Sequence, residues 1–369
     1  MTKQATARLT STRIFAALSA VLFHLTWTTD FFTNHSVMNL FSSGPTAVSY
    51  FFCLSGFVMA IAYSPDGVFK PIQYWIARIA RIYPVYLIAL VWFGLLGGLS
   101  VGKWFLNLTL LQAWIPGSAL SGNPPGWSLS TEVAFYLAFP LFIGALGKKW
   151  LPVTTVLVIV FWVFSQEMHE YVFTSFYPSY PYPSGLHDTL FYSPIFHFNE
   201  FFLGGVCGAW SRRQSPGVVG YRYDILTVVA AITIAALLAY QDYFRSIFVP
   251  TNSFPNGALA PLMLAFIYGL PRCRGKWAKV FELAPFLLLG EASYSVYLLQ
   301  IPWLETIQRS GIFDKFGITG SMRLVFYVLT LVMLSVAMFK LVESPLRKAI
   351  RSLSSGGKKL QHELPPWES

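Results

Sequence analysis

Long apolar runs recur along the whole chain, and short polar or basic stretches separate them. Ten runs, taken with their flanks, are long enough to cross the hydrocarbon core of a bilayer, which takes roughly 20 residues of helix. They cover residues 11–31, 46–63, 81–98, 127–146, 151–166, 195–210, 224–240, 257–270, 285–303 and 323–342. The pattern predicts an all-α, polytopic membrane helix bundle of about ten transmembrane helices.

A further apolar segment, residues 104–116, is only thirteen residues long. We interpret it as interfacial or re-entrant, because a helix of that length is too short to span a bilayer. With ten spans, 21 of the 26 Lys and Arg residues lie on the side of the N-terminus. An eleventh span would invert everything after it and move Lys148, Lys149, Arg212, Arg213, Arg272 and Arg274 to the outer side. The positive-inside rule therefore predicts ten spans, with both termini cytoplasmic.

Composition supports a multi-pass protein of the cytoplasmic (inner) membrane. The chain is 55% hydrophobic and 11% charged, whereas soluble domains have about 25% charged residues. Its net charge of +10 follows from basic residues gathered on the cytoplasmic side, so we expect membrane lipids, and no nucleic acid, as partners.

The sequence predicts one membrane domain, residues 1–351. Residues 352–369 form a short tail that is expected to be disordered. The three cysteines have no metal-ligand spacing, so no metal site is predicted.

The first span carries two ionisable residues, Arg13 and His24. At about 100° per residue their spacing of eleven ends roughly 20° past three full turns, so both lie on one helix face about 16 Å apart. An ionisable side chain inside a bilayer costs about 2.5–3.5 kcal/mol and usually has a function. The pair predicts a polar path into the bundle.

A second basic pair, Arg78 and Arg81, is expected where the third span leaves the cytoplasm. The i, i+3 spacing places both guanidiniums on one helix face, and two guanidiniums side by side suit phosphate groups. The alternative is an anchor that binds lipid phosphates at the membrane surface.

Glu132 lies near the outer end of the fourth span, in the segment WSLSTEVAFY. Its carboxylate is a candidate for orienting His24 as a general base, or for acting as an acid when protonated. The alternative is a carboxylate that stabilises a helix start, with Ser128 or Ser130 as the cap.

Three further histidines, His169, His187 and His197, are expected to face solvent or the membrane interface. The candidates for the acceptor side are Trp127, Ser128, Asn199, Glu200 and Tyr294.

Taken in order, these motifs resemble the acyltransferase 3 family of integral-membrane O-acyltransferases, which includes acetyltransferases of bacterial O-antigens and exopolysaccharides. The resemblance covers most of the chain. It rests on the spacing of Arg13 and His24, on FFCLSGFVM, on RIARIYPVY, and on WSLSTEVAFY, SYSVYLLQIP and VESPLRK.

The resemblance implies acyl-CoA as the donor, with acetyl-CoA expected, and no permanently bound cofactor. It implies a carbohydrate or lipid-linked saccharide hydroxyl as the acceptor, in polysaccharide biosynthesis. It makes His24 catalytic and the arginine pair necessary for function. The chain departs from the family at Gln300, where a histidine is common, which leaves acid–base chemistry at that position in doubt.

The mechanism we expect is direct transfer. Coenzyme A phosphates bind Arg78 and Arg81, the pantetheine arm passes Arg13, and His24 accepts the proton of the acceptor hydroxyl with help from Glu132. An acyl-histidine intermediate is an open alternative.

Two other classes of protein also stay open. One is a transporter or flippase of a lipid-linked saccharide, although no inverted repeat is visible in the sequence. The other is a binding or sensing protein, which would need neither His24 nor the arginine pair.

Overall fold

The computed structural model describes residues 3–26, 35–63, 67, 69–176, 179, 184–214, 217–248 and 256–354. Within these ranges the chain is helical and contains no strand, which confirms the all-α bundle. The tail from residue 355 onward lies outside the described residues.

Each of the ten predicted spans corresponds to a helix. These are α1 (Lys3–Thr26), α3 (Gly44–Ala62), α4 (Pro71–Gly97), α6 (Trp127–Phe142), α7 (Leu151–Phe176), α9 (Pro194–Arg213), α10 (Tyr221–Ala239), α12 (Ala260–Gly269), α13 (Ala284–Ser310) and α15 (Ser321–Met338). The shorter helices are α2 (His35–Ser42), α5 (Val101–Leu108), α8 (Gly185–Tyr192), α11 (Gln241–Phe248), α14 (Ile312–Lys315) and α16 (Ser344–Ser354).

Six helical segments of the described chain are long and apolar enough to cross a membrane. They are Gly44–Ala62, Pro71–Gly97, Pro124–Leu146, Leu151–Phe176, Tyr221–Ala239 and Ser321–Ile350. By contrast, α12 has ten residues and is only about 15 Å long. The count of ten spans and the cytoplasmic position of both termini stay predictions.

Several helices are longer than the hydrophobic pattern predicts, α4 and α7 by the most. Helix α4 begins at Pro71, ten residues before its predicted span, because Pro71 suits the first turn and the arginines that follow lie inside the helix. Helix α7 continues to Phe176, since no proline or glycine interrupts it after residue 166. In the segment 104–116, α5 ends at Leu108 and Leu110 has a positive φ of 55°. This segment therefore contains no single helix long enough to span.

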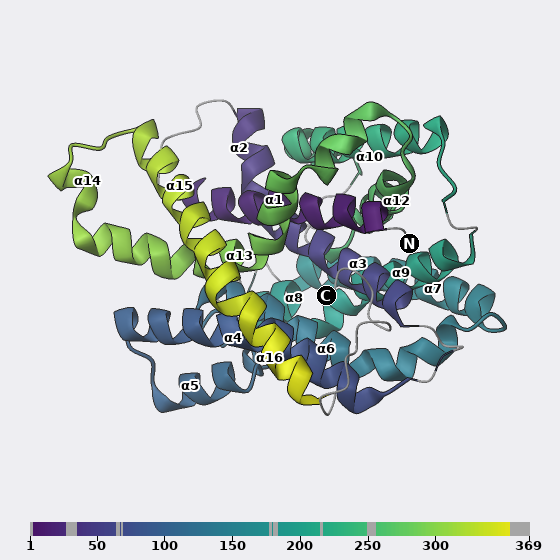
Figure 1. Cartoon of the computed structure of the whole chain (residues 1–369), viewed down its shortest axis with the longest axis horizontal. Coiled ribbons are helices and arrows are strands. Elements are labelled where there is room, and N and C mark those ends of the chain that lie inside the picture. Colours follow the sequence, from purple (N-terminus) through teal and green to yellow (C-terminus); the bar gives the residue numbers. More distant parts are fainter. Residues whose placement is uncertain are drawn as a thin grey trace.

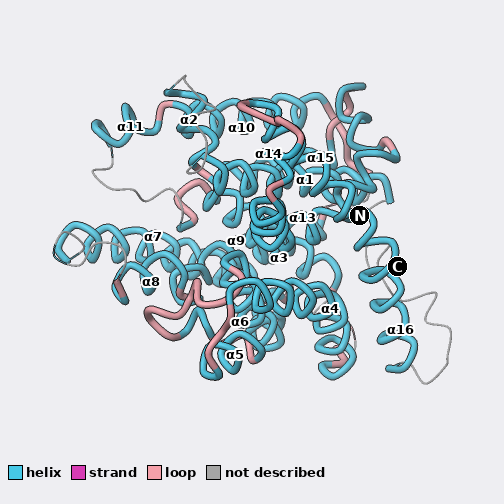
Figure 2. Tube along the Cα trace, turned by 90° about the vertical axis from the view of Figure 1, so that its left-hand side faces the viewer, coloured by secondary structure: helices cyan, strands magenta, loops and turns pink. Residues whose placement is uncertain are grey.

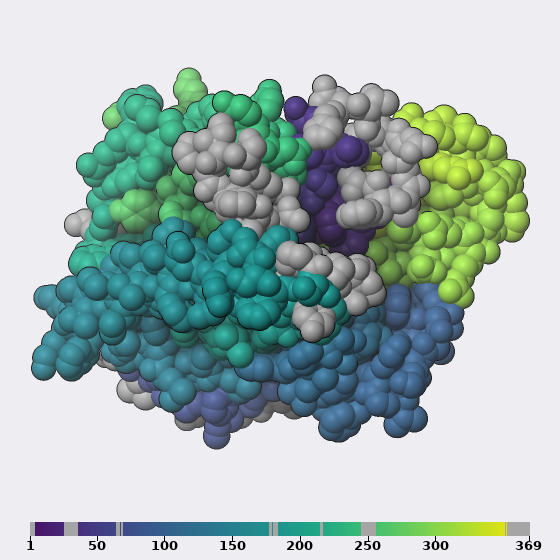
Figure 3. Space-filling model, turned by 180° about the vertical axis from the view of Figure 1, so that it is seen from behind, coloured from purple at the N-terminus to yellow at the C-terminus, as the bar shows by residue number. Residues whose placement is uncertain are grey.

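Two helix pairs organise the interior. Helix α1 packs along α13, and α3 packs along α9. Figure 2 shows α3, α9 and α13 in the middle of the molecule, with α2, α10 and α11 above them and α5, α6 and α8 below. Helix α16 lies along α4 (Figure 1). Seen from behind, the segment from α7 to α9 forms a broad band across the surface (Figure 3).

Prolines lie inside α4, α6 and α13, and in α6 and α13 a side chain bonds the backbone carbonyl that the proline leaves without its usual helical partner. A proline at position i lacks the N–H that would bond the carbonyl at i−4. For Pro302 in α13 that carbonyl belongs to Leu298, and Asn123 Nδ2 donates to it at 2.8 Å. For Pro140 in α6 it belongs to Tyr136, and the Tyr74 hydroxyl donates to it at 3.1 Å. Both helices continue through their prolines because these bonds replace the missing ones.

The contact between α3 and α9 depends on glycines that let the two backbones approach. A Cβ on Gly204 would collide with the Cys53 carbonyl, and one on Gly208 would collide with the Phe57 carbonyl. This spacing of small residues four apart is typical of close helix packing in membranes.

We expect Gly204→Ala to destabilise the protein by about 1–3 kcal/mol, because the added methyl meets backbone that cannot move aside. Thermal unfolding in detergent, followed by the monodisperse fraction on size exclusion, measures the effect. Gly102→Ala is the matched control, since a Cβ there meets nothing within 4 Å. Equal melting temperatures for the two variants would contradict this packing.

Candidate active site

A cavity of about 350 Å³ lies inside the bundle, and its wall comes from α1, α3, α4, α6 and α13 together with the start of α16. Its size suits part of a small-molecule ligand. The charged side chains in its wall are Arg13, Arg78, Arg81, Arg347, Glu132, Glu291 and Glu343. Thr6, Ile61 and Leu287 line it near the ends of their helices. On the predicted topology these ends face the cytoplasm.

The arginines in this wall differ in how they are held. Arg78 is 4% exposed and its guanidinium lies 5.7–6.0 Å from the ring centres of Tyr63, Tyr74 and Tyr136. Arg13 and Arg81 make no hydrogen bond or ion pair to any residue that the structure describes. Arg13 stands 5.9 Å from the ring centre of Phe51. The tyrosines therefore brace Arg78, whereas Arg13 and Arg81 present unpaired guanidiniums to the cavity.

The position of the arginine pair differs from the sequence prediction. Arg78 and Arg81 were expected at the membrane surface, where the third span leaves the cytoplasm. Because α4 begins at Pro71, both lie two to three turns inside the helix and line the cavity. An interior position favours a ligand site over a lipid-phosphate anchor.

Glu132 lines the same cavity and does not hydrogen-bond to His24. Its Oε1 accepts from the Tyr136 hydroxyl at 2.5 Å and from the Ser55 hydroxyl at 3.5 Å. The expectation that Glu132 orients His24 is therefore wrong for this structure. The carboxylate lies among the arginines and balances part of their charge.

His24 is oriented by a residue that the sequence left in doubt. Its Nδ1 lies 2.8 Å from the Ala20 carbonyl and 3.1 Å from Gln300 Oε1. The Gln300 amide nitrogen donates to the Tyr297 carbonyl at 2.8 Å, which turns Oε1 toward the histidine. Both partners of Nδ1 are acceptors, so Nδ1 carries the proton and Nε2 keeps its lone pair. Nε2 is thus the atom available as a general base.

The cavity ends short of His24. At its inner end it is lined by Val48 and Phe51 of α3, Ser128 of α6 and Tyr297 of α13. The Tyr297 hydroxyl donates to Ser128 Oγ at 3.0 Å. Gln300, which holds His24, lies one helical turn beyond Tyr297, a rise of about 4.5 Å. Neither His24 nor Gln300 lines the cavity, whose last residue in α13 is Tyr297.

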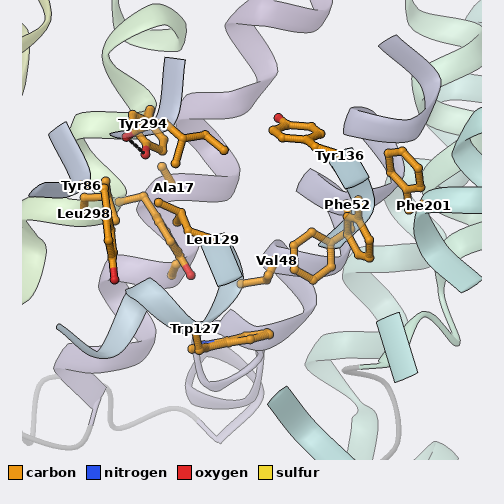
Figure 4. Close-up of a cluster of buried hydrophobic side chains, with 14 of the residues drawn as sticks. Ala17, Val48, Phe52, Tyr86, Trp127, Leu129, Tyr136, Phe201, Tyr294 and Leu298 are labelled. Carbon is orange, nitrogen blue, oxygen red and sulfur yellow. Dashed lines mark hydrogen bonds between the residues drawn. The ribbon is translucent and has the colours of Figure 1, made fainter. Parts of the chain in front are cut away.

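Three of the predicted acceptor-side residues lie outside the cavity. Trp127 is 8% exposed and packs against Phe52, as Figure 4 shows. Asn199 and Glu200 are fully buried, and both belong to a hydrogen-bonded core. Glu200 accepts from Ser49 at 2.6 Å. The expectation that Asn199 and Glu200 line the cavity is wrong, because their helix face is covered by α3, by α7 and by residues 256–257. Ser128 and Tyr294 do line it.

The expected exposure of two histidines is also wrong. His197 is 2% exposed, and its Nδ1 lies 3.0 Å from Glu200 Oε2. His169 is 1% exposed among the rings of Phe173, Phe191 and Phe196. The buried position of His169 follows from the continuation of α7 to Phe176, and that of His197 follows from the packing of α9 against α3, α6 and α7.

Several cavity residues were not singled out from the sequence. Glu343 lies in a π-helical turn, Phe339–Glu343, and accepts from Ser295 at 3.1 Å. Glu343 and Arg347 both belong to the segment VESPLRK, and Tyr297 belongs to SYSVYLLQIP. Charged residues in an apolar span were the available signal for Glu343, and a π-helical turn often marks a functional site.

Comparisons with known proteins identify the family. A family model described as "Acyltransferase domain" matches residues 7–341. Acyltransferase MdmB of Streptomyces mycarofaciens is 36% identical over 157 residues, which cover 38% of this chain and 40% of that protein. Exopolysaccharide production protein ExoZ of Rhizobium meliloti (strain 1021) is 24% identical over 332 residues, which cover 85% of this chain and 92% of that protein. No solved structure matches significantly. The chain belongs to the acyltransferase 3 family of membrane acyltransferases.

Proposed function

We propose that this protein is an O-acyltransferase of the cytoplasmic membrane that moves a short acyl group from acyl-CoA to a hydroxyl of a cell-envelope or exopolysaccharide saccharide. The observation that carries the proposal is the cavity together with His24. Among the described residues, Arg13 and Arg81 of the cavity wall and Nε2 of His24 have no hydrogen-bond partner, and Gln300, which contacts His24, lies one turn beyond Tyr297 of the cavity wall. The name of ExoZ supports the saccharide acceptor.

The arginines supply the donor site in this proposal. Coenzyme A carries a pyrophosphate and a 3′-phosphate, and guanidiniums bind such groups through paired, charge-assisted hydrogen bonds. The phosphates bind at Arg81 and Arg347 in the cavity wall, and Arg13 contacts the pantetheine arm or the pyrophosphate. Arg78, braced by tyrosines, adds positive charge behind them.

The reaction is an addition followed by an elimination at the thioester carbonyl. The acceptor oxygen forms a bond to the carbonyl carbon while His24 Nε2 takes the hydroxyl proton. The C–S bond then breaks, and the imidazolium returns the proton to the leaving thiolate. The products are an ester and free coenzyme A. Gln300 holds the Nδ1–H throughout, so the ring keeps the tautomer that the first step needs.

Transfer from labelled acetyl-CoA by the purified protein in detergent, offered a panel of saccharides, tests this function. We expect label in an alkali-labile ester of at least one saccharide. Transport of a lipid-linked saccharide in vesicles, with no transfer from any acyl-CoA, would favour the transporter alternative and contradict the proposal.

A further inference from the structure

We propose that Tyr297 closes the inner end of the donor cavity as a size filter, so that two- and three-carbon acyl groups reach His24 and longer ones do not. This inference rests on the proposed function and names the donor class that the same site accepts. Nothing in the family match specifies the length of the acyl group.

The first observation is the position of Tyr297. It lines the cavity, and Gln300, one turn later on α13, holds His24 at 3.1 Å. The two residues are also linked directly, because the Gln300 amide donates to the Tyr297 carbonyl. Tyr297 is the cavity residue of α13 nearest to Gln300, so our proposal places its side chain between the cavity and the histidine.

The second observation is how firmly the ring is held. Tyr297 is 7% exposed, and its hydroxyl donates to Ser128 Oγ, which in turn donates to the Pro125 carbonyl at 2.9 Å. Its ring packs edge-on against Phe51, with ring centres 6.1 Å apart. A ring fixed at its hydroxyl and along its edge yields little space to a passing group.

The third observation concerns the order in which parts of the donor arrive. Arg81 and Arg347 hold the phosphates away from Tyr297 in the proposed binding mode, so the acyl group leads the pantetheine arm and meets Tyr297 first. Val48, Phe51 and Tyr297 form a largely apolar wall there, with the Ser128 hydroxyl beside Tyr297 and the Arg13 guanidinium 5.9 Å from the Phe51 ring centre. In the proposal this wall takes a methyl or ethyl group. Each further methylene meets a packed wall, and one methylene in such a pocket changes kcat/KM by about 10–200-fold.

The test is the kcat/KM of wild type and variants with acetyl-, propionyl-, butyryl- and hexanoyl-CoA, using one saccharide acceptor. Wild type is expected to prefer the two shortest donors. Tyr297→Ala is expected to raise the hexanoyl-to-acetyl ratio of kcat/KM at least about tenfold. Tyr297→Phe, which keeps the ring, is expected to change this ratio much less.

Tyr294→Ala is the matched control. Tyr294 lines the same cavity one turn nearer its arginine end, where its hydroxyl donates to the Ile82 carbonyl at 2.6 Å. Removing its ring widens the path of the pantetheine arm, so total activity falls while the ranking of acyl groups stays the same. If Tyr297→Ala does not fold, Ser128→Val gives the opposite test, since added bulk beside the ring should lower propionyl relative to acetyl transfer.

Two results would overturn the inference. One is a wild-type enzyme that prefers hexanoyl-CoA. The other is an unchanged ranking in an active Tyr297→Ala variant, or in an active Ser128→Val variant. Failure of the proposed function is a different result, because wild type would then transfer no acyl group from any of the four donors.

Discussion

Replacing His24 by alanine is expected to lower acyl transfer by roughly 10²–10⁴-fold while the protein stays folded in the membrane. The expectation follows from the position of the ring, whose Nδ1–H is held by Ala20 and Gln300 and whose Nε2 is left as a base. Loss of a positioned general base costs about that factor. Steady-state transfer from acetyl-CoA, normalised to the monodisperse protein recovered in detergent, measures it.

Two variants make this result specific. Gln300→Leu removes one acceptor of the Nδ1 proton but leaves the Ala20 carbonyl, so we expect a smaller loss, in kcat rather than in KM for acyl-CoA. His187→Ala is the matched control, because His187 lies on α8 and does not line the cavity. A His24→Ala enzyme that retained half of the wild-type turnover would remove His24 from the mechanism.

Replacing Arg81 by alanine is expected to weaken coenzyme A binding about 10- to 100-fold. Arg81 lines the cavity without a partner among the described residues. All N–H donors of its guanidinium are therefore available for charge-assisted hydrogen bonds to a bound phosphate. One such contact contributes about 1.5–3 kcal/mol, and about 1.4 kcal/mol corresponds to a factor of ten. Isothermal titration of the detergent-solubilised protein with coenzyme A measures the change.

The substitutions around Arg81 separate charge from geometry. Arg81→Lys keeps the charge but loses the paired donors, so it should weaken coenzyme A binding with little effect on the KM of the saccharide. Arg13→Lys should reduce both donor affinity and turnover, since Arg13 lies deeper in the cavity. Arg309→Ala is the control, because Arg309 is half-exposed and pairs with Glu305. Normal binding by both Arg81 variants would place the donor site elsewhere.

The sequence predicted the parts of the site that depend on one helix. Helical periodicity placed Arg13 and His24 on one face, and both do lie on α1 facing α13. The spacing of Arg78 and Arg81 likewise placed both on one face of α4, and both line the cavity.

The parts that depend on distant helices were not predictable. Gln300 lies 276 residues from His24, and only the packing of α1 along α13 brings them together. Asn199 and Glu200 lie near the start of α9 on a face that α3 and α7 cover, and α3 approaches α9 closely through glycines. A hydrophobic pattern identifies the polar face of a helix, but it does not identify the neighbour that covers that face.

In the proposed mechanism one cavity holds the donor with its acyl group against Tyr297, one helical turn from Gln300, which contacts His24. A structure of the protein with a non-hydrolysable acetyl-CoA analogue tests it most directly. We predict density for the phosphates at Arg81 and Arg347, and the acetyl group at the inner end between Phe51 and Tyr297. An analogue bound with its nucleotide away from these arginines, or its acetyl group away from Tyr297, would contradict the account.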